Sequence, residues 1–411
     1  MNNVNPPSAR PFPVKLFLFA FFGWTFDFYD LVLLGFLKED VGRSLSLTHT
    51  TETWMLGVAL GTSGIGGIVC GALADRVGKR TMLSSTILLY SAGSVIAGLA
   101  PNLWVFLLGR GIVGLGVGGE WAIGHAMVAE AMRSEVRGRG AALLQAGEPI
   151  GVALAAVAGY LVAPRVGWRA VMVGSAVTAL LALAARKSMH LPDDVAPRPD
   201  FAAARAVVKF PRVASAWLLG VFKLGTYWTC YTWLPTFLIR EMHQGTGKSL
   251  AWVASAQAGQ FAGMLSFGWV SDRLGRRPAF SIFSLITACA IAPLAYRWSF
   301  LSVHPPLFWL VMVTLGFGSG CTAGFGALLA ELYPTEVRSL LMGTTYNLAR
   351  AAQLGAPVLV GWAVATGGLA GGLSVPLVLA IATASWVWVL PETRGIALPT
   401  LASAPAGPRA P

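Results

Sequence analysis

Apolar stretches of about twenty residues recur along the whole of this chain, and no other feature limits its possible folds as strongly. A helical stretch of that length crosses roughly 30 Å of hydrocarbon, so each one is a candidate transmembrane helix. The sequence therefore predicts an all-α integral membrane protein with twelve transmembrane helices. The predicted spans are 14–37, 53–74, 81–100, 103–131, 139–163, 168–187, 213–238, 251–271, 279–297, 305–332, 338–364 and 370–391.

The composition excludes a soluble protein of this size. Of the 411 residues, 55% are hydrophobic and only 12% are charged, which is too little charge to cover a water-exposed surface. The cysteines lie inside apolar stretches without the spacing of a metal site, so we expect them to be packing residues. These four cysteines are Cys70, Cys230, Cys289 and Cys321.

The formal net charge of +12 would suit a nucleic-acid partner, but its distribution along the chain has a simpler explanation. With the N-terminus inside, twenty Lys and Arg residues fall in cytoplasmic segments and seven fall on the other side. The positive-inside rule then places both termini in the cytoplasm. We expect a bacterial-type inner membrane protein that contacts the lipid bilayer and no nucleic acid.

The chain contains an internal repeat. The segment GALADRVGKR at 71–80 returns as GWVSDRLGRR at 268–277, an offset of 197 residues, and Glu130 and Arg137 return as Glu331 and Arg338. Parallel repeats of this kind are typical of transporter halves. The repeat predicts two six-helix bundles at 14–187 and 213–391, a cytoplasmic linker at 188–212, and cytoplasmic tails at 1–13 and 392–411.

The repeated segment is interpreted as a gate at the cytoplasmic side. An aspartate at a helix end, followed by a glycine turn and a basic cluster, can bridge neighbouring helices. The alternative is that the basic residues only set the membrane topology, which leaves the aspartates, the glycines and the repetition unexplained. The candidate gate residues are Asp75, Arg76, Arg80, Glu130, Arg137, Asp272, Arg273, Arg277, Glu331 and Arg338.

This paired motif resembles the signature of the major facilitator superfamily, and the resemblance extends over residues 14–395. It implies two six-helix bundles around one central cavity, which opens alternately to each side of the membrane. We expect the monomer to be the functional unit. No nucleophile and base arrangement or metal cluster stands out, so we expect a protein that is not an enzyme and needs no cofactor or metal.

Carboxyl groups inside the predicted membrane helices are candidates for proton coupling. Asp27 and Asp30 are three residues apart, so they share a helix face and could hold one proton between them. The alternative is that one of them pairs with a basic residue for structural reasons. Glu120 and Glu148 are the further proton-coupling candidates.

Buried cations are candidates for binding an anionic substrate. Arg110 could bind a substrate carboxylate, or it could hold a carboxylate of the first or fifth helix in place. Arg350 has no acidic neighbour in its own helix and suits an anion site, unless it forms a salt bridge with Glu148 or Asp30. The substrate-binding candidates are Arg350, Arg110, Asn347, Gln145, Lys223, Tyr227 and Gln353.

Segments 27–33, 118–124 and 144–149 resemble the sialate and monocarboxylate:proton symporter branch of the superfamily. Segment 343–350 similarly resembles the arginine-bearing helix of organic anion carriers. The resemblance implies proton-coupled uptake of a small organic anion such as lactate, pyruvate or sialate. Two alternatives remain open: a proton-driven exporter of drugs or metabolites, and an aromatic acid:proton symporter, in which glycine often takes the place of Phe28.

Overall fold

The computed structural model describes residues 14–47, 49–177, 180, 208–242 and 246–402, and these residues form helices and short connections. The predicted N-terminal tail and most of the predicted linker at 188–212 lie outside this part of the chain. Within it, eight helices are long and apolar enough to cross a membrane, or nine if one bent pair counts as a single span. The prediction of an all-α membrane fold is confirmed.

The N-terminal half begins with four continuous helices and continues with a broken one. The continuous helices are α1 (Val14–Ser44), α2 (His49–Val77), α3 (Lys79–Gly98) and α4 (Leu103–Ala131). The predicted span 139–163 is instead divided into α5 (Arg137–Gln145), α6 (Gly147–Val157), a π turn (Ala158–Val162) and α7 (Ala163–Val166). Pro149 has no N–H to donate to the carbonyl of Gln145, which accounts for the first break. α8 (Trp168–Gly174) follows.

The C-terminal half has the same order of elements. It comprises α11 (Phe210–Met242), α12 (Thr246–Leu274), α13 (Arg276–Tyr296), the short α14 (Trp298–Ser302), α15 (Pro305–Ser319), α16 (Gly324–Leu332), α17 (Arg338–Ala351) and α18 (Ala356–Trp386). A 3-10 turn divides the predicted span 305–332 between α15 and α16. The last two predicted spans meet inside α18 at Gly368, where a φ of 58° breaks the helical conformation.

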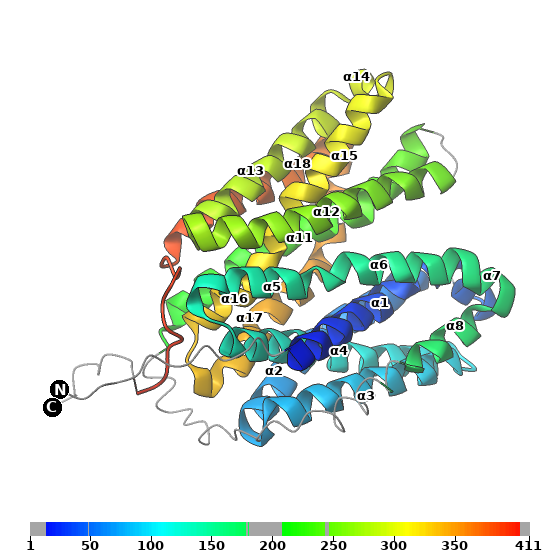
Figure 1. Cartoon of the computed structure of the whole chain (residues 1–411). Coiled ribbons are helices and arrows are strands. Elements are labelled where there is room, and N and C mark those ends of the chain that lie inside the picture. The colour runs from blue at the N-terminus through cyan, green and yellow to red at the C-terminus, as the bar shows by residue number, and fades with distance from the viewer. Residues whose placement is uncertain (1–13, 48, 178–179, 181–207, 243–245, 403–411) are drawn as a thin grey trace, which may run out of the picture.

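The two halves lie close together at one end of the molecule and separate toward the other end, where α7 and α14 lie (Figure 1). The close end carries two sharp turns at Gly78 and Gly275, with φ of 101° and 108°, which favour glycine. We call it the motif end. Here α2 packs on α17, and α12 packs on α5.

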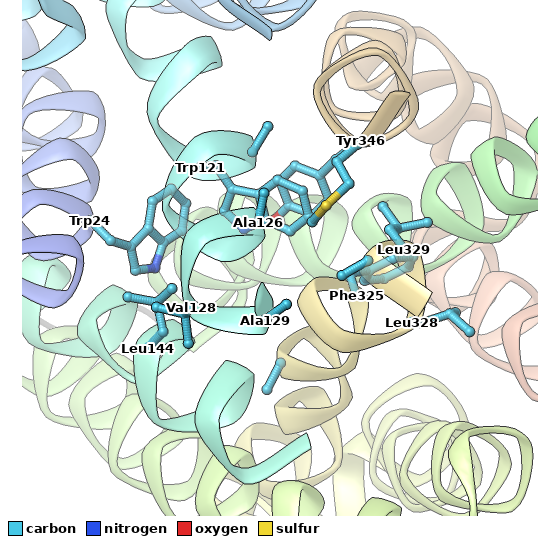
Figure 2. Close-up of a cluster of buried hydrophobic side chains, with 14 of the residues drawn as sticks. Trp24, Trp121, Ala126, Val128, Ala129, Leu144, Phe325, Leu328, Leu329 and Tyr346 are labelled. Atoms are coloured by element: carbon cyan, nitrogen blue, oxygen red, sulfur yellow. The ribbon is translucent and has the colours of Figure 1, made fainter. Parts of the chain in front are cut away.

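Glycines allow this close contact between the halves. A Cβ added at Gly71 of α2 would lie 2.6 Å from the carbonyl oxygen of Ser339, which is too close for two unbonded atoms. Figure 2 shows the largest buried apolar cluster, which takes Trp24 and Trp121 from the first half and Phe325 and Tyr346 from the second. The apolar core is therefore continuous between the halves near the motif end.

Candidate functional site

The repeated aspartates bind helix N-termini of the opposite half. The Asp75 carboxylate, at the end of α2, accepts hydrogen bonds from the backbone N–H groups of Ser339 (3.2 Å) and Leu340 (2.9 Å), in the first turn of α17. The Asp272 carboxylate, at the end of α12, accepts from Gly138 and Arg139 in the first turn of α5. A carboxylate there satisfies free N–H groups and opposes the positive end of the helix dipole.

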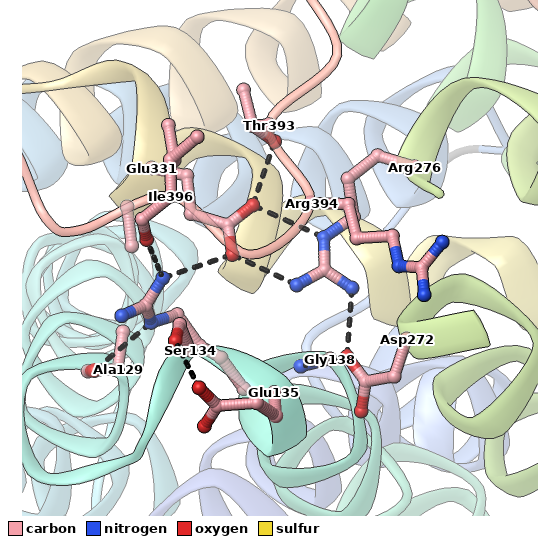
Figure 3. A network of polar contacts seen from close by, with 12 residues as sticks. Ala129, Ser134, Glu135, Gly138, Asp272, Arg276, Glu331, Thr393, Arg394 and Ile396 are labelled. Carbon is pink, nitrogen blue, oxygen red and sulfur yellow. Dashed lines mark hydrogen bonds and ion pairs between the residues drawn. The ribbon is translucent and has the colours of Figure 1, made fainter. Parts of the chain in front are cut away.

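The repeated glutamates form ion pairs that cross between the halves. Arg338 Nη1 of α17 lies 2.6 Å from Glu130 Oε1 of α4, and Arg137 Nη1 of α5 lies 3.0 Å from Glu331 Oε1 of α16. The second pair is fully buried within the network of Figure 3. We call the four aspartate and glutamate contacts the clamp, and it closes the motif end in this structure.

Two further residues of the clamp were not predicted from the sequence, although they occupy equivalent positions in the repeat. Lys79 lies 2.7 Å from Glu130, and Arg276 binds both Glu331 (2.8 Å) and Asp272 (2.9 Å). Arg273, a predicted gate residue, lies instead with its guanidinium 3.8 Å from the ring centre of Trp269. The gate roles predicted for Arg76 and Arg80 stay predictions.

The segment after α18 also joins the clamp. Backbone N–H groups of Arg276, Arg277 and Arg394 donate to the Glu392 carboxylate. Partial burial works to raise the pKa of Glu392, but these backbone hydrogen bonds together lower it. Thr393 donates to Glu331 at 2.6 Å, so the predicted tail is partly folded against the motif end.

A buried arginine, Arg350, lies at the contact between the halves and interacts with the Tyr346 side chain. Arg350 of α17 is 1% exposed, and neither terminal nitrogen has a hydrogen-bond partner among the described residues. Its guanidinium lies 5.1 Å from the ring centre of Tyr346 and 5.8 Å from that of Trp24. Tyr346 stacks on Trp121 across the halves, with ring centres 3.6 Å apart (Figure 2). The guanidinium is thus ready to accept an anion beside aromatic rings.

The four predicted proton-coupling carboxyl groups fall into two kinds. Asp30 accepts hydrogen bonds from Ser94 and Ser175, and Glu148 accepts from Gln145 (2.7 Å). By contrast, Asp27 and Glu120 are buried, and none of their carboxyl oxygens has a hydrogen-bond partner in the described part of the chain. Asp27 lies within electrostatic reach of Arg350.

Arg110 bonds to α1, and its predicted substrate role stays a prediction. Its guanidinium donates to the backbone carbonyls of Asp30 (3.2 Å) and Leu31 (3.3 Å) and interacts with the Asp30 carboxylate. It therefore holds α1 against α4 inside the first half.

Glu148 and Gln145 form a polar link between the halves. Gln260 of α12 donates to Glu148 at 3.0 Å, and the Tyr227 hydroxyl also interacts with this carboxyl group. The Gln145 carbonyl accepts from the Trp121 indole at 3.0 Å and bonds His125 at 2.9 Å. Gln145 thus contacts Trp121, whose ring stacks on Tyr346 of the other half.

The remaining predicted substrate-binding residues have different surroundings. Asn347 donates to the carbonyl of Gly118 at 2.7 Å and so joins α17 to α4. Gln353 donates to carbonyls of Val221 and Ala349. The Lys223 amine is buried without a hydrogen-bond partner among described residues. Searched over the same residues, the structure holds no group of three metal-binding side chains.

The Glu120 carboxyl group depends on a glycine in α1. A Cβ added at Gly23 would overlap it, lying 3.4 Å from its carboxyl carbon and closer to its oxygen. We expect Gly23→Ala to lower the free energy of unfolding by about 1–3 kcal/mol, because the added methyl group displaces the buried Glu120 carboxyl group. Thermal unfolding in detergent checks this. Gly35→Ala is the control, because Gly35 has open space around it; equal melting temperatures for both variants would contradict the prediction.

Comparisons with known proteins agree with this geometry. Residues 16–343 match the model of the Major Facilitator Superfamily. The chain is 32% identical to the probable 4-methylmuconolactone transporter of Cupriavidus pinatubonensis, over 98% of this chain and 96% of that protein. It is 28% identical to the sialic acid transporter NanX of Escherichia coli, over 87% of each chain. The solved structure of the proton:xylose symporter XylE has the same fold, with a TM-score of 0.79, 17% identity, and coverage of 95% and 98%.

Proposed function

This chain belongs to the Major Facilitator Superfamily, and we propose that it imports a small organic carboxylate together with protons. The observation that carries the proposal is the buried Arg350 guanidinium at the contact between the halves, whose terminal nitrogens have no hydrogen-bond partner among the described residues. A planar guanidinium binds a carboxylate through two parallel hydrogen bonds. The name of one relative, a sialic acid transporter, supports an acidic substrate.

Asp27 is the residue that we assign to the coupling of anion and proton. Its carboxyl group lies within electrostatic reach of Arg350, and in our proposal it is ionised and balances that charge while the site is empty. When a substrate carboxylate takes over that role, the buried Asp27 carboxylate loses its compensating charge and must bind a proton. Binding of the substrate anion to Arg350 and binding of a proton to Asp27 are therefore coupled.

Closing and opening of the clamp exposes the substrate site to one side of the membrane at a time. In our proposal the motif end faces the cytoplasm, with both termini on that side of a bacterial inner membrane, and one monomer carries out transport. The clamp then closes the cytoplasmic side while the site loads from outside. Rocking of the halves breaks the Arg338–Glu130 and Arg137–Glu331 pairs and opens the site inward.

The test is uptake of radiolabelled lactate, pyruvate, sialate and benzoate into proteoliposomes with an acidic outside. We expect at least one acid to accumulate, and we expect a protonophore to abolish that accumulation. Liposomes without protein and liposomes at equal pH are the controls. Absence of uptake of all four acids, together with proton-driven extrusion of a drug, would establish an exporter instead.

An aromatic carboxylate is the second candidate substrate. Trp24 and Tyr346 lie beside Arg350, and Tyr346 stacks on Trp121. These aromatic rings suit an aromatic acid whose carboxylate binds the Arg350 guanidinium. Preference for benzoate over lactate in the same uptake test distinguishes the two candidates.

A further inference from the structure

Two buried carboxyl groups from different helices, Asp27 and Glu120, lie within electrostatic reach of one another and have no hydrogen-bond partner among the described residues. Glu120 of α4 places its carboxyl group against the backbone of α1 at Gly23, and Asp27 lies one turn further along α1 on the same face. Asp27 is 0% and Glu120 2% exposed, and their charges repel one another. The described residues provide no hydrogen-bond donor to any of their four oxygens.

This environment allows at most one negative charge. A buried carboxylate needs hydrogen bonds or an opposite charge, and two adjacent carboxylates also repel each other. The charged groups that act on Asp27 are Arg350 on α17, which attracts, and Asp30 and Glu120, which repel. Arg110 is engaged by Asp30, and Arg350 is the cation that acts on Asp27.

We propose that Asp27 and Glu120 work as one acid pair that keeps one proton throughout the cycle and exchanges only the second. Each monovalent carboxylate then enters with one proton, and transport is electroneutral. This inference rests on the function proposed above and adds the stoichiometry and the separate roles of the two acids.

The charges balance at each step of this cycle. In the empty site Glu120 is protonated and Asp27 is ionised beside Arg350. A substrate anion then binds Arg350, and one proton from the outer solution binds Asp27, so the site gains one negative and one positive charge. After the motif end opens, the anion and that proton leave together, whereas Glu120 keeps its proton.

The stoichiometry is tested by separating the pH gradient from the membrane potential. Proteoliposomes at equal pH, with valinomycin and about a tenfold outward potassium gradient, receive the same four radiolabelled acids. Electroneutral symport predicts no added accumulation, whereas a second coupled proton would raise accumulation up to about tenfold. A potential-driven rise would therefore overturn the inference while leaving proton-coupled uptake intact.

Two variants test the division of roles. Asp27→Asn should lose accumulation driven by the pH gradient but keep exchange of labelled for unlabelled acid, because the amide resembles the protonated, loaded site. Glu120→Gln should slow uptake but keep one proton for each anion, measured from the final accumulation ratio at a set pH gradient. The inference fails if Glu120→Gln abolishes the coupling and Asp27→Asn keeps it.

Folding and function are checked separately in these experiments. Size-exclusion profiles and melting temperatures of the variants establish that loss of accumulation is not loss of fold. If wild-type protein takes up none of the four acids under a pH gradient, the proposed function itself is wrong and this inference falls with it.

Discussion

Replacing Arg350 by alanine should reduce the apparent affinity for the transported carboxylate by about hundredfold or more. Each charge-assisted hydrogen bond contributes about 1.5–3 kcal/mol, and a bidentate carboxylate would lose two of them. Every 1.4 kcal/mol corresponds to about a tenfold change in affinity. The measurement is the concentration dependence of uptake into proteoliposomes under a fixed pH gradient.

Two comparison variants make this test specific. Arg350→Lys keeps the positive charge but not the planar pair of donors, so we expect an affinity between those of wild type and Arg350→Ala. Arg43→Ala is the control, because the Arg43 side chain is 77% exposed and bonds the nearby Asp40 carboxylate and Glu39 carbonyl. If Arg350→Ala transports with unchanged affinity, the substrate anion binds elsewhere.

The internal repeat made the motif end predictable from the sequence. The motif combines an aspartate, a glycine turn and a basic cluster, and it occurs twice at one offset. Two copies of one motif are expected to make the same contact twice, and Asp75 and Asp272 do bind equivalent helix N-termini. The pattern did not separate Arg76 from Lys79 or Arg273 from Arg276. Which basic side chain turns inward depends on where the next helix begins, after the turns at Gly78 and Gly275, where φ is positive.

The binding partners of the carboxyl groups in the membrane helices were harder to predict. A spacing of three places Asp27 and Asp30 on one face of α1, but they point about 60° apart around the helix axis. That difference is enough for Asp30 to meet Arg110 and Ser94, and for Asp27 to lie beside Glu120 and Arg350. Only the packing of α1 against α4 and α17 distinguishes them, and no local pattern in the sequence contains it.

The helix interruptions were predictable in part. Pro149 follows Gln145 at a spacing that removes one backbone hydrogen bond, so the break between α5 and α6 had a local signal. The break between α15 and α16 contains no proline. It lies where Gly320 and Gly324 approach Gly263 of α12 and Phe267 too closely for larger residues, which is a property of the packed bundle.

The second large effect is expected at Glu331, the most heavily bonded residue of the clamp. Its carboxylate accepts from Arg137, Arg276 and Thr393 and is fully buried. Glu331→Gln removes the buried carboxylate partner of Arg137 and leaves Arg276 with Asp272 alone, which costs about 3–5 kcal/mol. Because Arg137 belongs to the other half, much of that cost falls on the closed state, and a shift of this size moves a two-state equilibrium more than a hundredfold.

The shift can be measured by labelling a cysteine placed inside the closed contact. Ala142 of α5 is buried against Gly268 of α12, so Ala142→Cys in a background without the four native cysteines reports opening of the motif end. We expect Glu331→Gln to speed its reaction with maleimide at least about tenfold and to slow uptake. Glu130→Gln should act less strongly, because the Glu130 side chain is 26% exposed and better screened by solvent. Equal labelling rates in wild type and Glu331→Gln would mean that the clamp does not hold the motif end closed.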